Sequence, residues 1–212
     1  FMRTGMIEQD SGSGRYLLGS YALDVGLSAL GRLDPVRLAG HILENLCEDI
    51  QETVALAVWG NRGATIVRIF DSGAPITITL RAGTVLPLCK SATGQAFAAF
   101  FRSPFLKQML DQELREISEG SKIAITAARR QLEKTLTEIR RHGISRASGS
   151  LTPGINGFSA PVFDHSGMMV AAITSLGAVG EFSVEWDSPV AKAMLAAAGD
   201  LSRKLGFNRP QR

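Results

Sequence analysis

The stretch FSAPVFDHSGMMVAAITS, residues 158–175, contains two strand-like runs separated by a turn. The runs FSAPVF and MMVAAITS are rich in apolar and β-branched residues, and DHSG between them supplies residue types that tight turns favour. We therefore expect a β-hairpin in which Gly167 adopts the left-handed conformation. Asp164 beside His165 could form an acid–base pair, but turn chemistry accounts for both residues without catalysis.

An earlier part of the chain has the same character. VALAVW from Val54 and ATIVRIF from Ala64 flank a Gly-Asn-Arg-Gly turn, and ITITL from Ile76 alternates apolar and hydroxyl residues. These patterns predict three strands joined antiparallel. They supply half of a sheet, which the later hairpin completes.

Helices are predicted between and around these strands. The signals are a helix starting at Asp34-Pro35, one over residues 126–142 with Thr126 as its cap, and one from Ser188-Pro189 to a stop at Gly206. The order of helices and hairpins, without strand–helix–strand regularity, predicts an α+β domain of the GAF or PAS type. We expect an antiparallel sheet of about five or six strands flanked by helices.

Composition limits the function classes. Twenty-three Lys and Arg against 20 Asp and Glu leave a net charge of +3, and the basic residues of 126–142 are interleaved with Glu133 and Glu138. This pattern indicates a solvated face and not a nucleic-acid stripe. Cys47 and Cys89 show no repeated pair spacing, so we expect no disulfide framework, no metal site, no cofactor and a reduced cytoplasmic setting. No leader or membrane-length apolar run is expected either.

The first 33 residues are expected to lie outside this domain. A hairpin around Ser11-Gly12-Ser13-Gly14 is either the tail of a truncated upstream domain or a simple N-terminal arm. Residues 16–33 carry apolar side chains on nearly every side of a helical wheel, so that helix is expected to pack against a partner subunit.

A candidate ligand site lies in AGTVLPLCKSATGQAFAAF, residues 82–100. Ser91 stands at the expected cap of a helix that begins Ala92-Thr93-Gly94, and the amides of a helix N-terminus can hold a carboxylate or carbonyl. The alternative is a capped helix whose small residues only permit close packing.

The later hairpin supplies the facing residues. Side chains alternate along a strand, so Thr174 and Leu176 share one face, as do Gly157 and Ser159. If a pocket separates this sheet from the helix at Ser91, Thr174 and Ser159 could donate hydrogen bonds and Leu176 could form an apolar wall.

These segments carry a resemblance to a known family. PLCKSATGQAF and HGISRASGSLTPGINGFSAPVFDHSGMMVAAITSLG resemble the two signatures of the isocitrate lyase regulator (IclR) family of transcription regulators, and TGMIEQDSGSGRYLLG resembles the wing of its winged helix-turn-helix. The resemblance covers essentially the whole chain. It implies a wing remnant in residues 1–18, a linker helix in 19–33 and a GAF-like effector-binding and oligomerisation domain in 34–208. It also implies homodimers or homotetramers, DNA contact through a mostly missing N-terminal domain, no catalytic residues and no membrane partner.

The resemblance also implies where a ligand binds. The family's ligand-contacting positions correspond here to Ser91, Ala92, Gly94, Ala147 or Ser148, Gly157, Thr174 and Leu176. Members that bind small keto acids carry a carboxylate, a thiol and hydroxyls at places where this chain has Ala147 or Ser148, Gly157 and Leu176. This departure favours a larger or more apolar effector, such as an aromatic acid, or a protein with no pocket ligand.

The predicted function is therefore the effector-binding and oligomerisation part of a small-molecule-responsive transcription regulator, and not an enzyme. One alternative is a GAF-like redox enzyme in which Lys90 lowers the thiol pKa of a nucleophilic Cys89. The other is a ligand-free oligomerisation domain.

Overall fold

The computed structural model describes residues 2–73, 80–121 and 123–208, and the chain divides into two compact units, residues 1–34 and residues 35–212. In the first unit, strands β1 (Ile7–Gln9) and β2 (Tyr16–Leu18) form the expected antiparallel hairpin, and helix α1 (Ser20–Leu30) follows. The helix expected from residue 16 begins at Ser20 because the three preceding strand residues pair with β1.

Helix α1 has an unusually apolar surface. None of its residues is buried. Leu23, Leu27 and Leu30 lie on one side at helical spacing and are 63%, 57% and 38% exposed. Within the described part of the first unit, no element covers this leucine stripe.

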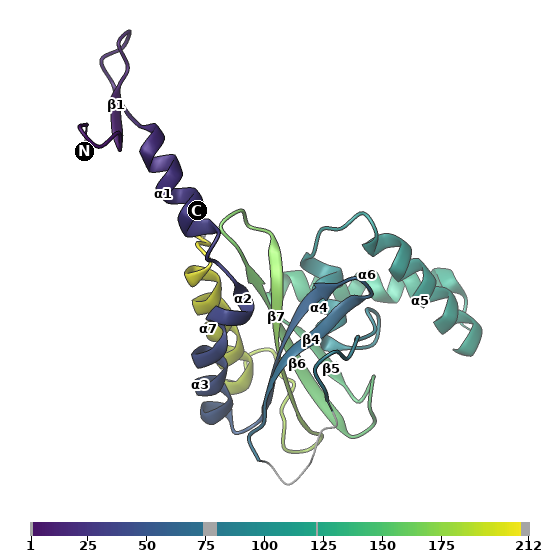
Figure 1. Ribbon diagram of the computed structural model, residues 1–212. Helices are drawn as coiled ribbons and strands as arrows, with labels where there is room; N and C mark the ends of the chain where they lie inside the picture. Colours follow the sequence, from purple (N-terminus) through teal and green to yellow (C-terminus); the bar gives the residue numbers. More distant parts are fainter. Residues whose placement is uncertain (1, 74–79, 122, 209–212) are drawn as a thin grey trace. The chain divides into compact units, whose positions relative to one another are not determined.

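The second unit contains a five-stranded antiparallel sheet in the order β4-β3-β7-β6-β5 (Figure 1). Its strands are β3 (Thr53–Gly60), β4 (Gly63–Phe70), β5 (Ser145–Ser148), β6 (Ile155–Phe163) and β7 (Met169–Ala178). The α+β fold and both expected hairpins are confirmed, and Gly167 in the β6–β7 turn has a φ of +75°. Most of the strand expected at residues 76–80 lies outside the described residues.

The outer edge of β4 is covered by the chain itself. The N–H of Ile66 donates to the carbonyl of Thr84, and the N–H of Leu86 donates to the carbonyl of Ala64. These hydrogen bonds hold residues 84–86 alongside β4. The same segment leads a few residues later into the helix capped by Ser91.

Helices cover the two faces of the sheet (Figure 1). Short α2 (Pro35–Leu38) precedes α3 (Gly40–Ile50), which packs with α7 (Pro189–Lys204) on one face. On the other face α4 (Ala92–Phe100) lies directly on the strands, α6 (Ile125–His142) packs on α4, and α5 (Leu106–Ser121) packs on α6. Ala55, Ala57, Ala96 and Ala172 in the shared core let α4 approach the sheet closely.

Of the three predicted Ser and Thr caps, two are confirmed. Ser91 and Ser188 cap α4 and α7, since each hydroxyl accepts a hydrogen bond from the amide three residues on. The cap predicted at Thr126 is wrong, because α6 begins at Ile125 and Thr126 already lies inside its first turn. The helix expected after Asp34 begins at Pro35 and is interrupted at Ala39.

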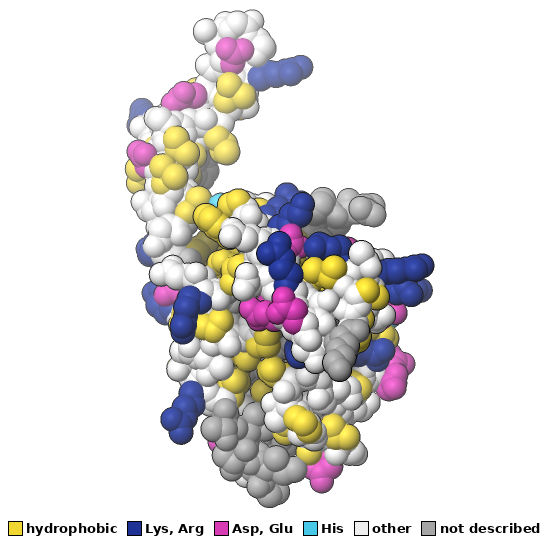
Figure 2. Space-filling view, turned by 90° about the vertical axis from the view of Figure 1, so that its right-hand side faces the viewer, with side chains coloured by type: hydrophobic (Ala, Val, Ile, Leu, Met, Phe, Trp, Pro, Cys, Tyr) yellow, Lys and Arg dark blue, Asp and Glu magenta, His cyan; other side chains and the backbone are white. Residues whose placement is uncertain are grey.

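The basic residues of α6 belong to a mixed surface. A guanidinium nitrogen of Arg129 lies 2.9 Å from Oδ1 of Asp111 on α5. In the face shown in Figure 2, Lys and Arg side chains are interspersed with Asp and Glu. This arrangement agrees with a solvated face. Within residues 2–73, 80–121 and 123–208, no helix is both long and apolar enough to cross a bilayer.

Gly94 provides a test of how closely α4 is seated. A Cβ at Gly94 would lie 2.1 Å from the carbonyl oxygen of Pro87 and 2.6 Å from Cα of Leu88, and backbone cannot yield as a side chain does. We expect Gly94→Ala to lower the free energy of unfolding by about 1–3 kcal/mol, as measured by urea denaturation followed by circular dichroism.

The matched control is Gly199→Ala in α7, where the nearest neighbour of the new methyl group is the flexible guanidinium of Arg203 at 3.6 Å. We expect this change to raise the free energy of unfolding by about 0.5–1 kcal/mol, because alanine favours a helix over glycine. Equal effects of the two substitutions would contradict the close seating of α4.

Candidate functional site

A cavity of about 420 Å³ lies between the N-terminal end of α4 and the α4-side face of the sheet. Its lining comes from the segment before α4, from α4 itself, and from β5, β6, β7 and the β5–β6 connection. The lining residues are Leu80, Thr84, Leu86, Ser91, Ala92, Thr93, Ala147, Leu151, Thr152, Pro153, Ile155, Asn156, Gly157, Thr174 and Leu176. This volume lies within the range of small-molecule sites, and the wall is mostly apolar with a few hydroxyl and backbone groups.

The start of α4 forms one end of this cavity. The Ser91 hydroxyl accepts from the amide of Gly94 at 2.8 Å and donates to the carbonyl of Pro87 at 2.7 Å. The cap therefore satisfies the Gly94 amide, while Ala92 and Thr93 belong to the first turn, where amides have no acceptor within the helix. Both residues line the cavity, which therefore adjoins the positive end of the α4 dipole, where an anionic or carbonyl oxygen is favoured.

A row of buried hydroxyls joins α4 to the sheet. The Thr93 and Thr174 hydroxyl oxygens are 2.7 Å apart, and those of Thr174 and Ser159 are 3.0 Å apart. Three hydroxyls that share two hydrogen bonds keep one O–H hydrogen for a further acceptor. If that hydrogen is at the Thr93 end, it is available to an acceptor atom inside the cavity.

Six of the predicted ligand positions line the cavity together: Ser91, Ala92, Ala147, Gly157, Thr174 and Leu176. Three others do not. Gly94 faces the backbone of Pro87, and Ser159 is fully buried against Thr174. Ser148 is exposed, and it follows Ala147 on β5, where successive side chains point to opposite faces.

Several lining residues were not predicted from the sequence. Thr93 lies two residues after the predicted cap, and its contact with Thr174 joins positions 81 residues apart. Leu151, Thr152 and Pro153 come from the β5–β6 connection, which the sequence identified only as part of a signature. Leu80, Thr84 and Leu86 reach the cavity through the segment that pairs with β4. No local pattern predicts these contacts.

Among the described residues that line the cavity, none has an ionisable side chain. Among the residues that the structure describes, no group of three or more His, Cys, Asp or Glu is placed to hold a metal ion. Charge recognition in the cavity therefore rests on the α4 dipole and on hydrogen bonds. Thr174 and Thr93 are each 1% exposed, so hydrogen bonds to them are little weakened by competition with bulk water.

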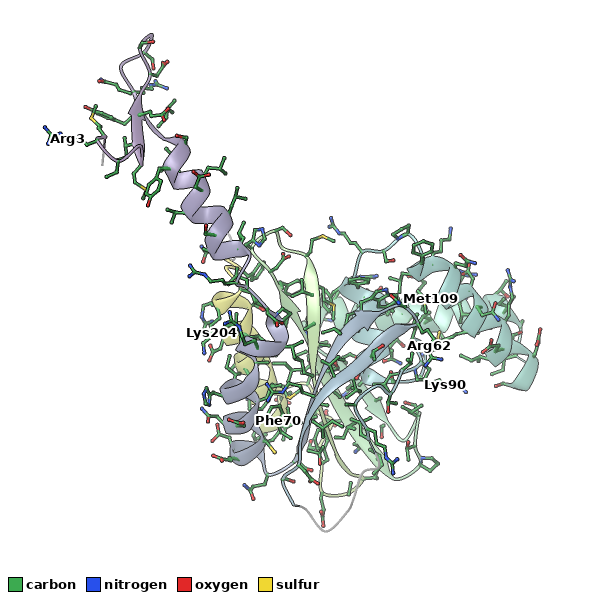
Figure 3. All side chains as sticks on the ribbon, in the orientation of Figure 1. Arg3, Arg62, Phe70, Lys90, Met109 and Lys204 are labelled. Atoms are coloured by element: carbon green, nitrogen blue, oxygen red, sulfur yellow. The ribbon has the colours of Figure 1, made fainter. Side chains whose placement is uncertain are left out.

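Cys89 lies outside the cavity lining and is half-buried. Burial, and after it the negative charge of Glu113, raises the pKa of the Cys89 thiol to about 12. Lys90 lowers this pKa only slightly by comparison, and its side chain is exposed (Figure 3). The three histidines have other settings, since His41 pairs with Glu44, His142 stacks on Trp186 and His165 lies in the β6–β7 turn. Lys90 thus acts in the direction that the redox alternative requires, but burial and Glu113 outweigh it, so this geometry gives that alternative no support.

Comparisons with known proteins identify the family of the chain. The model of the bacterial transcriptional regulator IclR C-terminal domain matches residues 27–203. The HTH-type transcriptional regulators KipR of Bacillus subtilis strain 168 and KdgR of Escherichia coli K12 are each 24% identical to the chain over 204 residues. Each match covers 96% of this chain, and the matched regions make up 80% of the length of KipR and 76% of the length of KdgR.

A solved structure, HmgR of Pseudomonas aeruginosa, is 35% identical with a TM-score of 0.86, and the match covers 98% of this chain and 81% of HmgR. Both the sequence matches and this structural match extend over nearly the full length of the chain. The chain therefore belongs to the IclR family of bacterial transcriptional regulators and contains the family's C-terminal domain.

Proposed function

We propose that the cavity is the effector site of this regulator and that the effector is an organic acid with an apolar body, such as an aromatic carboxylic acid. The observation that carries the proposal is an uncharged, largely apolar cavity that ends at the first turn of α4. The carboxylate would accept from the Ala92 and Thr93 amides, and the apolar body would lie against Leu86 and Leu176.

The proposed ligand set is Ser91, Ala92, Thr93, Ala147, Gly157, Thr174 and Leu176, with Ser159 acting through Thr174. Neither Ala147 nor Gly157 contributes a polar side-chain contact, and the small side chain of Ala147 leaves room for an apolar group. A Cβ at Gly157 would lie 2.7 Å from a Leu176 methyl group, so glycine there makes space for the leucine side chain. These features favour an aromatic acid over a small keto acid.

We further propose that residues 1–18 belong to the wing of a winged helix-turn-helix that contacts DNA, and that α1 is a linker through which a homodimer or homotetramer assembles. The leucine stripe of α1 supports self-association, because an apolar stripe this exposed needs a partner in water. The protein would act in the cytoplasm, where its DNA target and metabolites meet.

Regulation would then depend on differential binding. An effector shifts an equilibrium between two arrangements of the linker helices only if it binds one arrangement more tightly. A change in linker spacing would alter how two wings meet half-sites about one helical turn apart.

The effector site is tested by a thermal-shift screen of aromatic and aliphatic carboxylic acids. A ligand that binds only the native state raises the melting temperature, and we expect benzoate-type acids to do so in the wild type. Ser91→Ala and Thr174→Val are expected to reduce that shift, because they disturb the α4 cap and the hydroxyl row. Ala147→Phe is expected to abolish it by filling the cavity.

The matched control is Ser188→Ala, which removes the corresponding cap of α7, far from the cavity lining. Both cap variants should lose about 1 kcal/mol of stability, but only Ser91→Ala should weaken the ligand-induced shift. Equal shifts in wild type, Ser91→Ala, Thr174→Val and Ala147→Phe would place the ligand elsewhere.

The role of α1 is tested by sedimentation velocity on the double variant Leu23→Lys with Leu27→Lys. Two lysines in the leucine stripe would have to be desolvated in an interface, so we expect dissociation into smaller species. Ser28→Lys, on another side of the same helix, serves as the control and should leave the assembly unchanged. Dissociation by Ser28→Lys alone would show that charge, not the stripe, is responsible.

The redox alternative is tested by the reactivity of Cys89. At pH 8 a thiol with a pKa of about 12 is almost entirely neutral, and only the thiolate reacts. We expect alkylation of Cys89 by iodoacetamide in the folded protein to be at least about a hundredfold slower than in urea, as followed by peptide mass spectrometry. Comparable rates in the two states would restore the thiol as a candidate nucleophile.

A further inference from the structure

Glu113 on α5 holds the backbone of the segment that leads into α4. Its Oε1 accepts from the amide of Leu88 at 2.8 Å, and its Oε2 accepts from the amide of Cys89 at 2.9 Å. Each carboxylate oxygen thus accepts a hydrogen bond from one of two successive backbone amides. Hydrogen bonds to a charged acceptor are stronger than those between neutral groups, so this is a firm attachment.

The same segment is held from its other side by α4 and β5. The carbonyl of Cys89 accepts from Nε2 of Gln95 at 2.9 Å, and Oε1 of Gln95 lies 3.4 Å from the Ser145 hydroxyl, which donates to it. The Ser150 hydroxyl donates to the carbonyl of Lys90 at 2.9 Å. The peptide groups around Cys89 are therefore fixed between α5, α4 and the β5–β6 region.

This attachment lies directly behind the cavity wall. Leu86, Ser91, Ala92 and Thr93 line the cavity at the two ends of the segment that Glu113 holds. The segment has little freedom on the side of α4, because Gly94 is packed against the Pro87 backbone. A shift of the Leu88 and Cys89 amides would therefore move the first turn of α4, which offers the amides of the proposed carboxylate site.

Glu113 adds a polar attachment to a helix that otherwise packs through apolar side chains, with Leu106 in the core between α4 and the sheet and Leu114 against α4 and α6. In α5 only Leu106 and Leu114 are buried. The side chain of Glu113 is thus a direct polar link from α5 to the cavity wall, distinct from the apolar packing of Leu114 with Leu132 and Leu136 of α6.

We propose that Glu113 is a positioning residue of the effector site: it holds residues 86–93 in the arrangement that binds the ligand and couples α5 to the occupancy of the cavity. The proposal rests on the proposed effector function. Without Glu113, residues 86–93 would adopt the binding arrangement only part of the time. The apparent affinity for the ligand would then fall in proportion to the fraction of molecules in that arrangement. Coupling is reciprocal, so ligand binding should in turn make the Glu113 attachment more stable.

The test compares wild type, Glu113→Gln and Glu113→Ala with two controls. Glutamine keeps one acceptor oxygen but places an NH₂ group against the other amide, and alanine removes both acceptors. Glu119→Gln removes the same charge from an exposed position of α5, and Ser188→Ala supplies a comparable loss of stability away from the cavity. Hydrogen–deuterium exchange of peptides covering residues 86–93 is measured, together with calorimetric binding of benzoate and phenylacetate.

In both Glu113 variants we expect exchange at Leu88 and Cys89 to be at least about tenfold faster and the affinity for the aromatic acid to be about tenfold weaker. The two controls should match wild type in both measurements. Weaker binding in Ser188→Ala as well would mean that the effect is one of global stability, and the proposal would be overturned.

The outcomes separate the two proposals. If wild type binds an aromatic acid and the Glu113 variants bind it equally well, the positioning role is wrong and the effector site remains. If wild type binds neither benzoate nor phenylacetate, the proposed effector class is wrong. Hydrogen–deuterium exchange then tests separately whether Glu113 restrains residues 86–93. Faster amide exchange in the Glu113 variants supports the proposal that Glu113 restrains residues 86–93. Unchanged exchange overturns that proposal.

Discussion

The seating of the first turn of α4 on the sheet is the constraint from which the site follows. Gly94 lies so close to the Pro87 backbone that no side chain fits between them, and the Thr93 hydroxyl meets that of Thr174 at 2.7 Å. The Thr93–Thr174 hydrogen bond ties the helix start to β7, and the close approach of Gly94 to Pro87 fixes the helix start against the segment that precedes it. The cavity is the space left beside that start, and the small side chains of Ala92 and Ala147 leave it open.

This seating also determines what kind of recognition the site can provide. A cavity without ionisable side chains avoids the large cost of burying an unpaired charge when no ligand is bound. The α4 dipole and the first-turn amides still attract an oxygen anion, because they carry partial charge that is part of the backbone. The bonds from Glu113 to the preceding segment hold those amides in place without adding charge to the cavity lining.

Local sequence signals predicted the parts of the fold that are decided by neighbouring residues. The caps at Ser91 and Ser188 and the left-handed Gly167 depend on contacts within a few positions. The prediction of a cap at Thr126 is wrong because the helix begins at Ile125, whose side chain packs against the cluster of Leu114, Leu132 and Leu136. Six predicted ligand positions meet at one cavity, largely because strand alternation placed Gly157, Thr174 and Leu176 on the same face of the sheet.

The sequence by itself determined the α+β class, the two hairpins, the helix start at Ser91 and, through its motifs, the resemblance to the IclR family. Only the tertiary structure decided that Thr93 bonds to Thr174, that Ser159 lies behind the cavity instead of lining it, and that Glu113 holds the Leu88 and Cys89 amides. The reason is physical. Periodicity and capping reflect interactions within a few residues, whereas these contacts join elements far apart in the chain, and their geometry depends on how closely the helices pack.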